Sequence, residues 1–98
     1  MQMEINQLHD IFFSRLRLSI ISCLYTRKMY FKELKNVTDA TDGNLSVQLK
    51  KLALENYIQS RSVIIKRKVN TEYALTKKGR EAFKSYVQLL EEVITQEE

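Results

Sequence analysis

The side chains with the clearest chemistry in this sequence are polar and basic groups on one face of a helix predicted within residues 41–58. Leucines at positions 45, 49 and 52 recur at helical spacing, so they would form the buried stripe of that helix. The remaining surface carries amide, hydroxyl and cationic groups, which bind base edges and phosphates in duplex DNA. The predicted DNA-contacting residues on it are Asn44, Ser46, Val47, Gln48, Lys50 and Lys51.

Each of these groups suits a different part of a duplex. An exposed amide, such as that of Gln48 or Asn44, can make two hydrogen bonds to adenine in the major groove. Ser46 can bond a base or a phosphate, and Val47 can touch a thymine methyl. The two lysines suit phosphates, which strengthen binding without reading sequence. The alternative is an ordinary surface helix that is packed by its leucines.

A second basic group lies between two stretches that favour β-strands. Residues 57–65 are rich in β-branched and aromatic side chains, and residues 71–75 alternate in character. We predict a hairpin with its tip at residues 66–70, where Asn70 suits a turn. A basic tip can contact the minor groove or backbone of DNA, or it can serve only to guard an edge strand. Its candidate DNA-contacting residues are Lys66, Arg67 and Lys68.

These two groups need helices and turns to position them. The apolar spacing predicts one helix that ends at about residue 12 and a second helix over residues 15–25 that is capped by Ser14. The alternative is one continuous helix through both segments. Next come a short strand at 29–31, a helix at 32–37 and a turn at 39–40. Thr41 or Asp42 would cap the 41–58 helix, and Thr76 a final helix. The predicted fold is α+β, mainly α: a winged helix-turn-helix with a two-stranded wing.

The two ends of the chain carry apolar stripes that predict a homodimer. The apolar stripe of the last predicted helix is too long for the core of one small domain, so we expect a second copy of the chain to cover part of it. We therefore predict a single domain over residues 1–98, with dimerisation helices at 1–13 and 77–98. The predicted interface residues are Leu8, Ile11, Phe12, Tyr86, Leu89, Leu90 and Val93.

The charge distribution favours a polyanion as the partner of the middle of the chain. The 98 residues carry a net charge of +4, which divides into zero for residues 1–25, +8 for 26–84 and −4 for 85–98. This distribution suggests that the basic middle builds a nucleic-acid-binding surface and that the neutral and acidic ends have another role. A solvated lysine-rich face is the alternative.

Composition argues against other classes of function. The sequence contains no glycine-rich phosphate loop, no nucleophile with a histidine partner and no carboxylate pair in an apolar context. His9 and Cys23 cannot make a four-ligand zinc site within one chain. We therefore expect no enzymatic activity, no cofactor and no metal. Apolar runs fall far below the roughly 20 residues of a membrane span, and no leader opens the sequence, so we expect a cytoplasmic protein.

Taken together, the motifs resemble winged-helix transcriptional regulators of the MarR and ArsR type, most closely small stand-alone winged-helix DNA-binding proteins. Phe13 and Arg15 stand where such regulators often carry His and Pro, and Asn56 stands where a Gly is usual. The Cys and His clusters of metal-sensing relatives are missing. The resemblance covers roughly residues 12–86, and its motifs lie at 17–20, 31–35, 42–46, 49–52, 57–58 and 73–79.

The resemblance implies a sequence-specific DNA-binding transcriptional regulator. Its partners would be double-stranded DNA and a second copy of itself, and it would act as a repressor by occupying an inverted-repeat site. The alternative is a winged-helix module that binds proteins through apolar surfaces. Salt separates the two, because DNA binding weakens steeply as the salt concentration rises.

Overall fold

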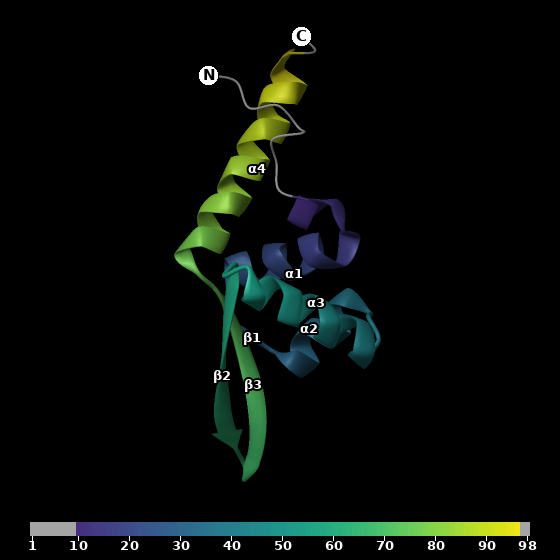
Figure 1. The fold of residues 1–98 in the computed structure, drawn as a ribbon, viewed down its shortest axis with the longest axis vertical. Coiled ribbons are helices and arrows are strands. Elements are labelled where there is room, and N and C mark those ends of the chain that lie inside the picture. Colours follow the sequence, from purple (N-terminus) through teal and green to yellow (C-terminus); the bar gives the residue numbers. More distant parts are fainter. Residues whose placement is uncertain (1–9, 97–98) are drawn as a thin grey trace.

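The structure of the protein is a computed structural model that describes residues 10–96. In this part of the chain, four α-helices and a short 3-10 helix combine with three β-strands (Figure 1). This is the predicted winged helix-turn-helix. Its elements are η2 (Asp10–Phe13), α1 (Arg15–Thr26), β1 (Met29–Tyr30), α2 (Phe31–Thr38), α3 (Asp42–Leu54), β2 (Ile58–Ile65), β3 (Lys68–Leu75) and α4 (Lys77–Gln96).

Local capping explains where the helices begin and end. The Ser14 hydroxyl accepts a hydrogen bond from the Arg17 amide at 3.3 Å, so α1 begins as a new helix and does not continue η2. Thr41 caps α3 in the same way, and Asp39 ends α2 in the left-handed conformation with φ of 56°. Asn56 after α3 also has a positive φ, of 63°, a conformation that Asn tolerates at the end of a helix.

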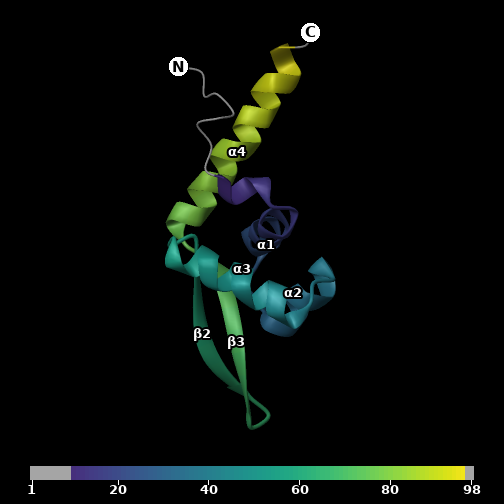
Figure 2. The ribbon, with the colours of Figure 1, turned by 45° about the vertical axis from the view of Figure 1, so that its right-hand side comes forward.

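The short strand predicted at 29–31 is present as β1, Met29–Tyr30, and joins the two strands of the wing in one sheet. All three strands are antiparallel in the order β1-β3-β2, and β1 pairs with β3 through Met29 and Tyr73. This pairing attaches the base of the hairpin to the start of α2. The hairpin then extends from the helices, and α4 extends in the opposite direction (Figures 1 and 2).

The hairpin turn is shorter than predicted. Ile65 pairs with Lys68, which leaves Lys66 and Arg67 as a two-residue loop with φ of 50° and 67°. Two positive φ angles define a type I′ turn, whose twist matches that of the flanking strands. The placement of residues 68–70 in the tip was therefore wrong, because they already pair in β3. Asn70 is a strand residue.

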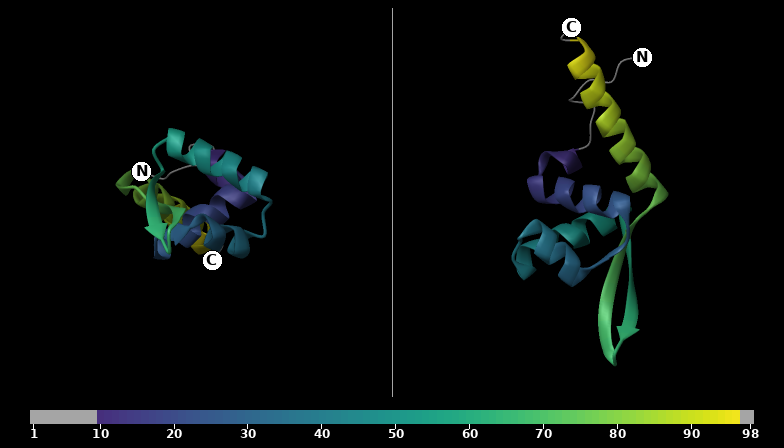
Figure 3. Two further views of the ribbon diagram at one scale, coloured as in Figure 1. Left: turned by 90° about the horizontal axis from the view of Figure 1, so that it is seen from below. Right: turned by 180° about the vertical axis from the view of Figure 1, so that it is seen from behind.

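The core lies where α1, α2 and α3 meet the base of the hairpin, and Figure 3 (right) shows these helices between α4 and the wing. Leu34, Leu45 and Leu52 are fully buried there. Viewed from below, the hairpin lies at one edge of the group of helices (Figure 3, left). No helix within residues 10–96 is long and apolar enough to span a membrane.

Several residues predicted to contact a second copy are buried within the chain. Ile11, Phe12 and Leu89 are each at most 5% exposed. The Phe12 ring stacks on that of Tyr86 with centroids 4.7 Å apart, which closes η2 onto α4. These side chains therefore have little surface to offer a partner, because their own chain already covers it. Leu90 and Val93 keep 40% and 39% exposure, and Leu8 lies outside the described residues.

Candidate nucleic-acid interface

Helix α3 presents most of the predicted reading residues to the outside. Its leucine stripe is buried against the core, so the opposite side of the helix faces solvent. Val47 is 60% exposed near the middle of this side. The other exposed candidates are Asn44, Ser46, Lys50 and Lys51.

Gln48 differs from these residues because it is half-buried and already bonded. Its Oε1 accepts a hydrogen bond from Nη1 of Arg17 at 3.1 Å. The same guanidinium donates from Nε to the Ile11 carbonyl and from Nη2 to the Asp10 carbonyl, both at 3.1 Å. A paired contact to adenine uses both the oxygen and the nitrogen of an amide. In this geometry only the NH₂ group of Gln48 remains available to hydrogen-bond a base.

Two further α3 positions belong to the exposed side and were not predicted. An added Cβ on Gly43 would meet no atom within 4 Å, so open space surrounds the first turn of the helix. Leu54, in the last turn, is 78% exposed and lines a shallow depression with Val47 and Lys50. A helical projection opposite the leucine stripe could have found both positions.

The wing carries its unpaired cations at the tip. Arg61, nearer the base, is neutralised by Glu72 on the facing strand at 2.8 Å. The other ion pairs within the described part of the chain join Arg27 to Glu33 and Lys35 to Asp42, so none involves the tip. Lys66, Arg67 and Lys68 are exposed. The positive charge of the wing is therefore concentrated at its end.

Two basic residues in the first turn of α4 are held by local contacts. Nζ of Lys78 donates to the Glu55 carbonyl at 2.9 Å and lies over the Tyr57 ring. The Arg80 guanidinium stacks on Tyr25 and donates to its carbonyl at 3.3 Å. These two cations attach α4 to the body. Lys50, Lys51 and the wing tip make no such contacts to the described residues.

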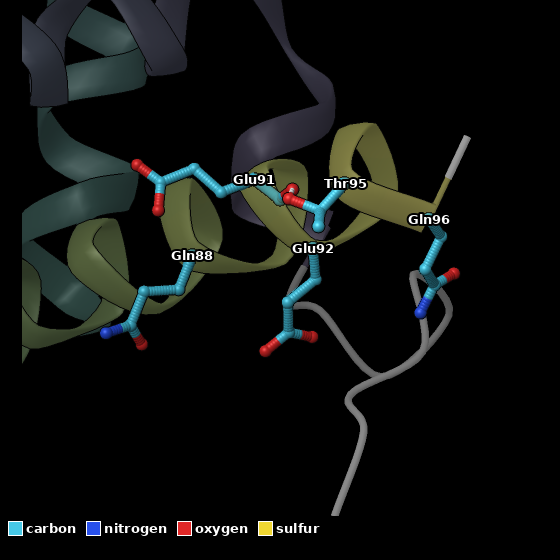
Figure 4. Close-up of a pocket in the computed structure, with 5 residues that line it drawn as sticks. All are labelled: Gln88, Glu91, Glu92, Thr95 and Gln96. Atoms are coloured by element: carbon cyan, nitrogen blue, oxygen red, sulfur yellow. Dashed lines mark hydrogen bonds between the residues drawn. The ribbon is translucent and has the colours of Figure 1, made fainter. Parts of the chain in front are cut away.

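The far end of α4 has the opposite charge. Figure 4 shows Glu91 and Glu92 beside three polar side chains, all from one exposed stretch of this helix. Carboxylates repel phosphates, so this end does not suit DNA. The two ends of the elongated molecule therefore differ in charge, as the sequence predicted.

Within residues 10–96, no cluster of three or more His, Cys, Asp or Glu side chains could hold a metal ion. Cys23 is half-buried, and burial raises the pKa of its thiol. A raised pKa favours the protonated thiol, which is the unreactive form at neutral pH. His9 lies outside the described residues.

Comparison with known proteins agrees with this geometry. The chain is 40% identical over 78 residues to an uncharacterized protein of Methanocaldococcus jannaschii, covering 79% of this chain and 85% of that protein. A transcriptional regulator homologue of Pyrococcus horikoshii is 30% identical with a TM-score of 0.80, over 88% of this chain and 86% of the other.

The fold is also that of MarR-family regulators. A regulator assigned to that family in Enterococcus faecalis has a TM-score of 0.81 over 95% of this chain and 86% of its own, at 21% identity. The sequence pattern of the winged helix DNA-binding domain matches residues 16–94, which is most of the chain. With its helix-turn-helix, basic wing and matching sequence, this chain belongs to the winged helix DNA-binding domain family.

Proposed function

We propose that this protein is a sequence-specific DNA-binding transcriptional regulator that represses by occupying an inverted-repeat site as a homodimer. The observation that carries the proposal is a group of exposed cations without an ion pair in residues 10–96: Lys50 and Lys51 on α3, and Lys66, Arg67 and Lys68 at the wing tip. Other exposed cations without an ion pair, such as Lys28, Lys32 and Lys84, are spread over the rest of the described surface. Unpaired cations on a reading helix and a wing are suited to phosphates on two neighbouring parts of a duplex.

The wing turn supports this proposal through its backbone. Lys66 and Arg67 both have positive φ, a conformation in which Asn-Gly is favoured and the Cβ of most other residues is strained. The tip therefore carries two cations where the turn geometry favours other residues. Strain of this kind is expected where a side chain has a function outside the fold.

On α3 we assign base reading to the first half of the helix. Asn44, Ser46 and Val47 are exposed there and can meet base edges, while Lys50 and Lys51 contact phosphates. Gln48 contributes only the two N–H donors of its amide nitrogen, because Arg17 holds its oxygen. Donors of this kind suit major-groove acceptors, which are N7 of either purine, guanine O6 and thymine O4.

The dimer contact is assigned to the outer half of α4. Leu90, Val93 and Ile94 are 40%, 39% and 65% exposed on this helix. An apolar row on a helix that extends away from the body suits contact with the same row of a second copy. A symmetric pair can place two α3 helices about 34 Å apart, which is one turn of DNA.

The test of DNA binding is a salt titration. Duplexes are selected from a random pool, and affinity for the enriched sequence is then measured across salt concentrations. The double substitution Lys66→Asn with Arg67→Gly should relax the turn, weaken binding and lower the salt slope by about one for each phosphate that is no longer neutralised. Arg61→Gln is the matched control, since it removes a wing cation that Glu72 already pairs, and it should leave the slope unchanged. Absence of salt-dependent binding by the natural protein would overturn the proposal.

The dimer is tested by sedimentation of Leu90→Asp. The expected product is a folded monomer that binds one half-site weakly and loses most of its affinity for the inverted repeat. Gln88→Asp, at an exposed polar position of the same helix, is the control for added charge and should remain dimeric. A Leu90→Asp variant that remains a dimer with unchanged affinity would show that the dimer interface lies elsewhere.

A protein-binding module is the second candidate function. It is favoured by Val47 and Leu54, which are 60% and 78% exposed on the same side of α3. Such a surface would bind an apolar partner with little dependence on salt. The same titration therefore distinguishes this candidate from the DNA-binding regulator.

A further inference from the structure

We propose that one face of the wing tip is an apolar DNA contact. Ile64 and Val69 would pack against the deoxyribose rings that line the minor groove, while Lys66 and Arg67 at the turn meet phosphates. This inference rests on the proposed function, and it gives the wing a contribution to binding that does not depend on charge.

The two apolar side chains form an exposed pair. Ile64 on β2 and Val69 on β3 are directly opposite each other in the register of the hairpin. They are 75% and 70% exposed. Side chains paired in this way stand on the same face of the sheet, so together they make one small apolar surface.

This surface is separate from the hydrophobic core, although it lies on the same face of the hairpin. At the base of that face, Ile58 is 2% exposed and Leu75 packs against the core. The polar pair Ser62 and Thr71 then interrupts the apolar run before the tip. The tip pair is therefore not an extension of the core, and nothing in residues 10–96 covers it.

The charge around the pair indicates which partner would cover it. Lys66, Arg67 and Lys68 adjoin the pair, and residues 62–71 include no Asp or Glu. Three cations would repel the tip of a second copy. The minor groove combines negative potential with walls made of sugar, so it offers both kinds of surface to the tip.

The double substitution Ile64→Thr with Val69→Thr tests the contact. Threonine keeps the β-branch, so the strands retain their preference for this structure. The apolar burial that these substitutions remove would account for about tenfold weaker binding of the selected duplex. Because an apolar contact releases no counterions, the plot of log affinity against log salt should shift without a change of slope.

The control is Ile65→Thr. Ile65 lies on the opposite face, pairs with Lys68 and is 37% exposed, so its substitution should leave affinity unchanged. Unchanged affinity in the double variant would overturn the inference. So would a reduced slope, since the effect would then come from weaker neutralisation of phosphates.

A second measurement uses the natural protein and does not depend on any variant folding. Methyl NMR with a soluble paramagnetic probe reports whether the Ile64 and Val69 methyls are protected when duplex is added. Protection is expected, and methyls that stay exposed in the bound state would overturn the inference. If the protein binds DNA while these methyls stay exposed, the inference alone fails; if no duplex binds, the proposed function fails as well.

Discussion

Helices α3 and α4 each begin with a threonine cap and a glycine in the first turn, but the surroundings of the two starts differ. At α3, Thr41 accepts one hydrogen bond from the Asn44 amide at 3.2 Å, and Gly43 faces open space. At α4, an added Cβ on Gly79 would lie 2.1 Å from the Tyr57 carbonyl oxygen. Similar local sequences therefore begin a solvent-exposed helix at α3 and a packed joint at α4. The joint is the contact of residues 76–79 with residues 56–57.

The joint at α4 has a further set of bonds. The Thr76 hydroxyl accepts from the Gly79 amide at 3.0 Å and donates to the Asn56 carbonyl at 2.6 Å. It thereby connects the start of α4 to the turn that follows α3. In the proposed dimer, this connection would let the α4 contact fix the separation of the two reading helices.

The largest effect is expected from Gly79→Ala. The new methyl group would collide with the carbonyl oxygen of Tyr57, which cannot move without separating α4 from the residue that precedes β2. We expect a loss of about 3 kcal/mol in the free energy of unfolding. Urea denaturation measures it, and a loss below that of a simple surface substitution would show that the joint can adjust.

Thr76→Ala should have the next largest effect. It removes the cap of α4 and leaves the Asn56 carbonyl without its hydroxyl donor. We expect a loss of about 2 kcal/mol in unfolding free energy. Thr76→Ser keeps the hydroxyl and should recover most of this loss; if serine and alanine behave alike, the methyl group and not the hydroxyl stabilises the joint.

Thr41→Ala should cost less, because its cap makes one exposed hydrogen bond. A loss of about 1 kcal/mol is expected in the same denaturation experiment. Thr41→Ser is the matched control. Equal losses for the alanine variants of Thr41 and Thr76 would contradict the distinction between an open start and a packed joint.

The sequence predicted the local features well because their causes are local. Caps at Ser14, Thr41 and Thr76, and the leucine stripe of α3, depend on residues within a few positions of one another. These features place the reading helix and the hairpin. The winged fold follows from their order along the chain.

Features that depend on distant residues were not predictable in this way. The bond that holds Gln48 comes from Arg17, which is far away in sequence and gives no periodic signal. Phe12 and Tyr86, both predicted to contact a second copy, stack on each other within the same chain. The tight turn was missed because Lys66 and Arg67 are not the residues that usually signal it.

The smallest change, Gly43→Ala, is the sharpest test of the open helix start. No atom would meet the new methyl group and the φ of Gly43 is not positive, so alanine should raise the free energy of unfolding by about 0.5 to 1 kcal/mol. If α3 enters the major groove by its first turn, the same methyl group should weaken binding of the selected duplex by about tenfold, because the DNA would occupy the open space. A variant that is more stable and binds less well would show that Gly43 serves DNA contact at the expense of stability. A more stable variant with unchanged affinity would show that DNA does not approach this turn, and base reading would then belong to residues from Ser46 onward.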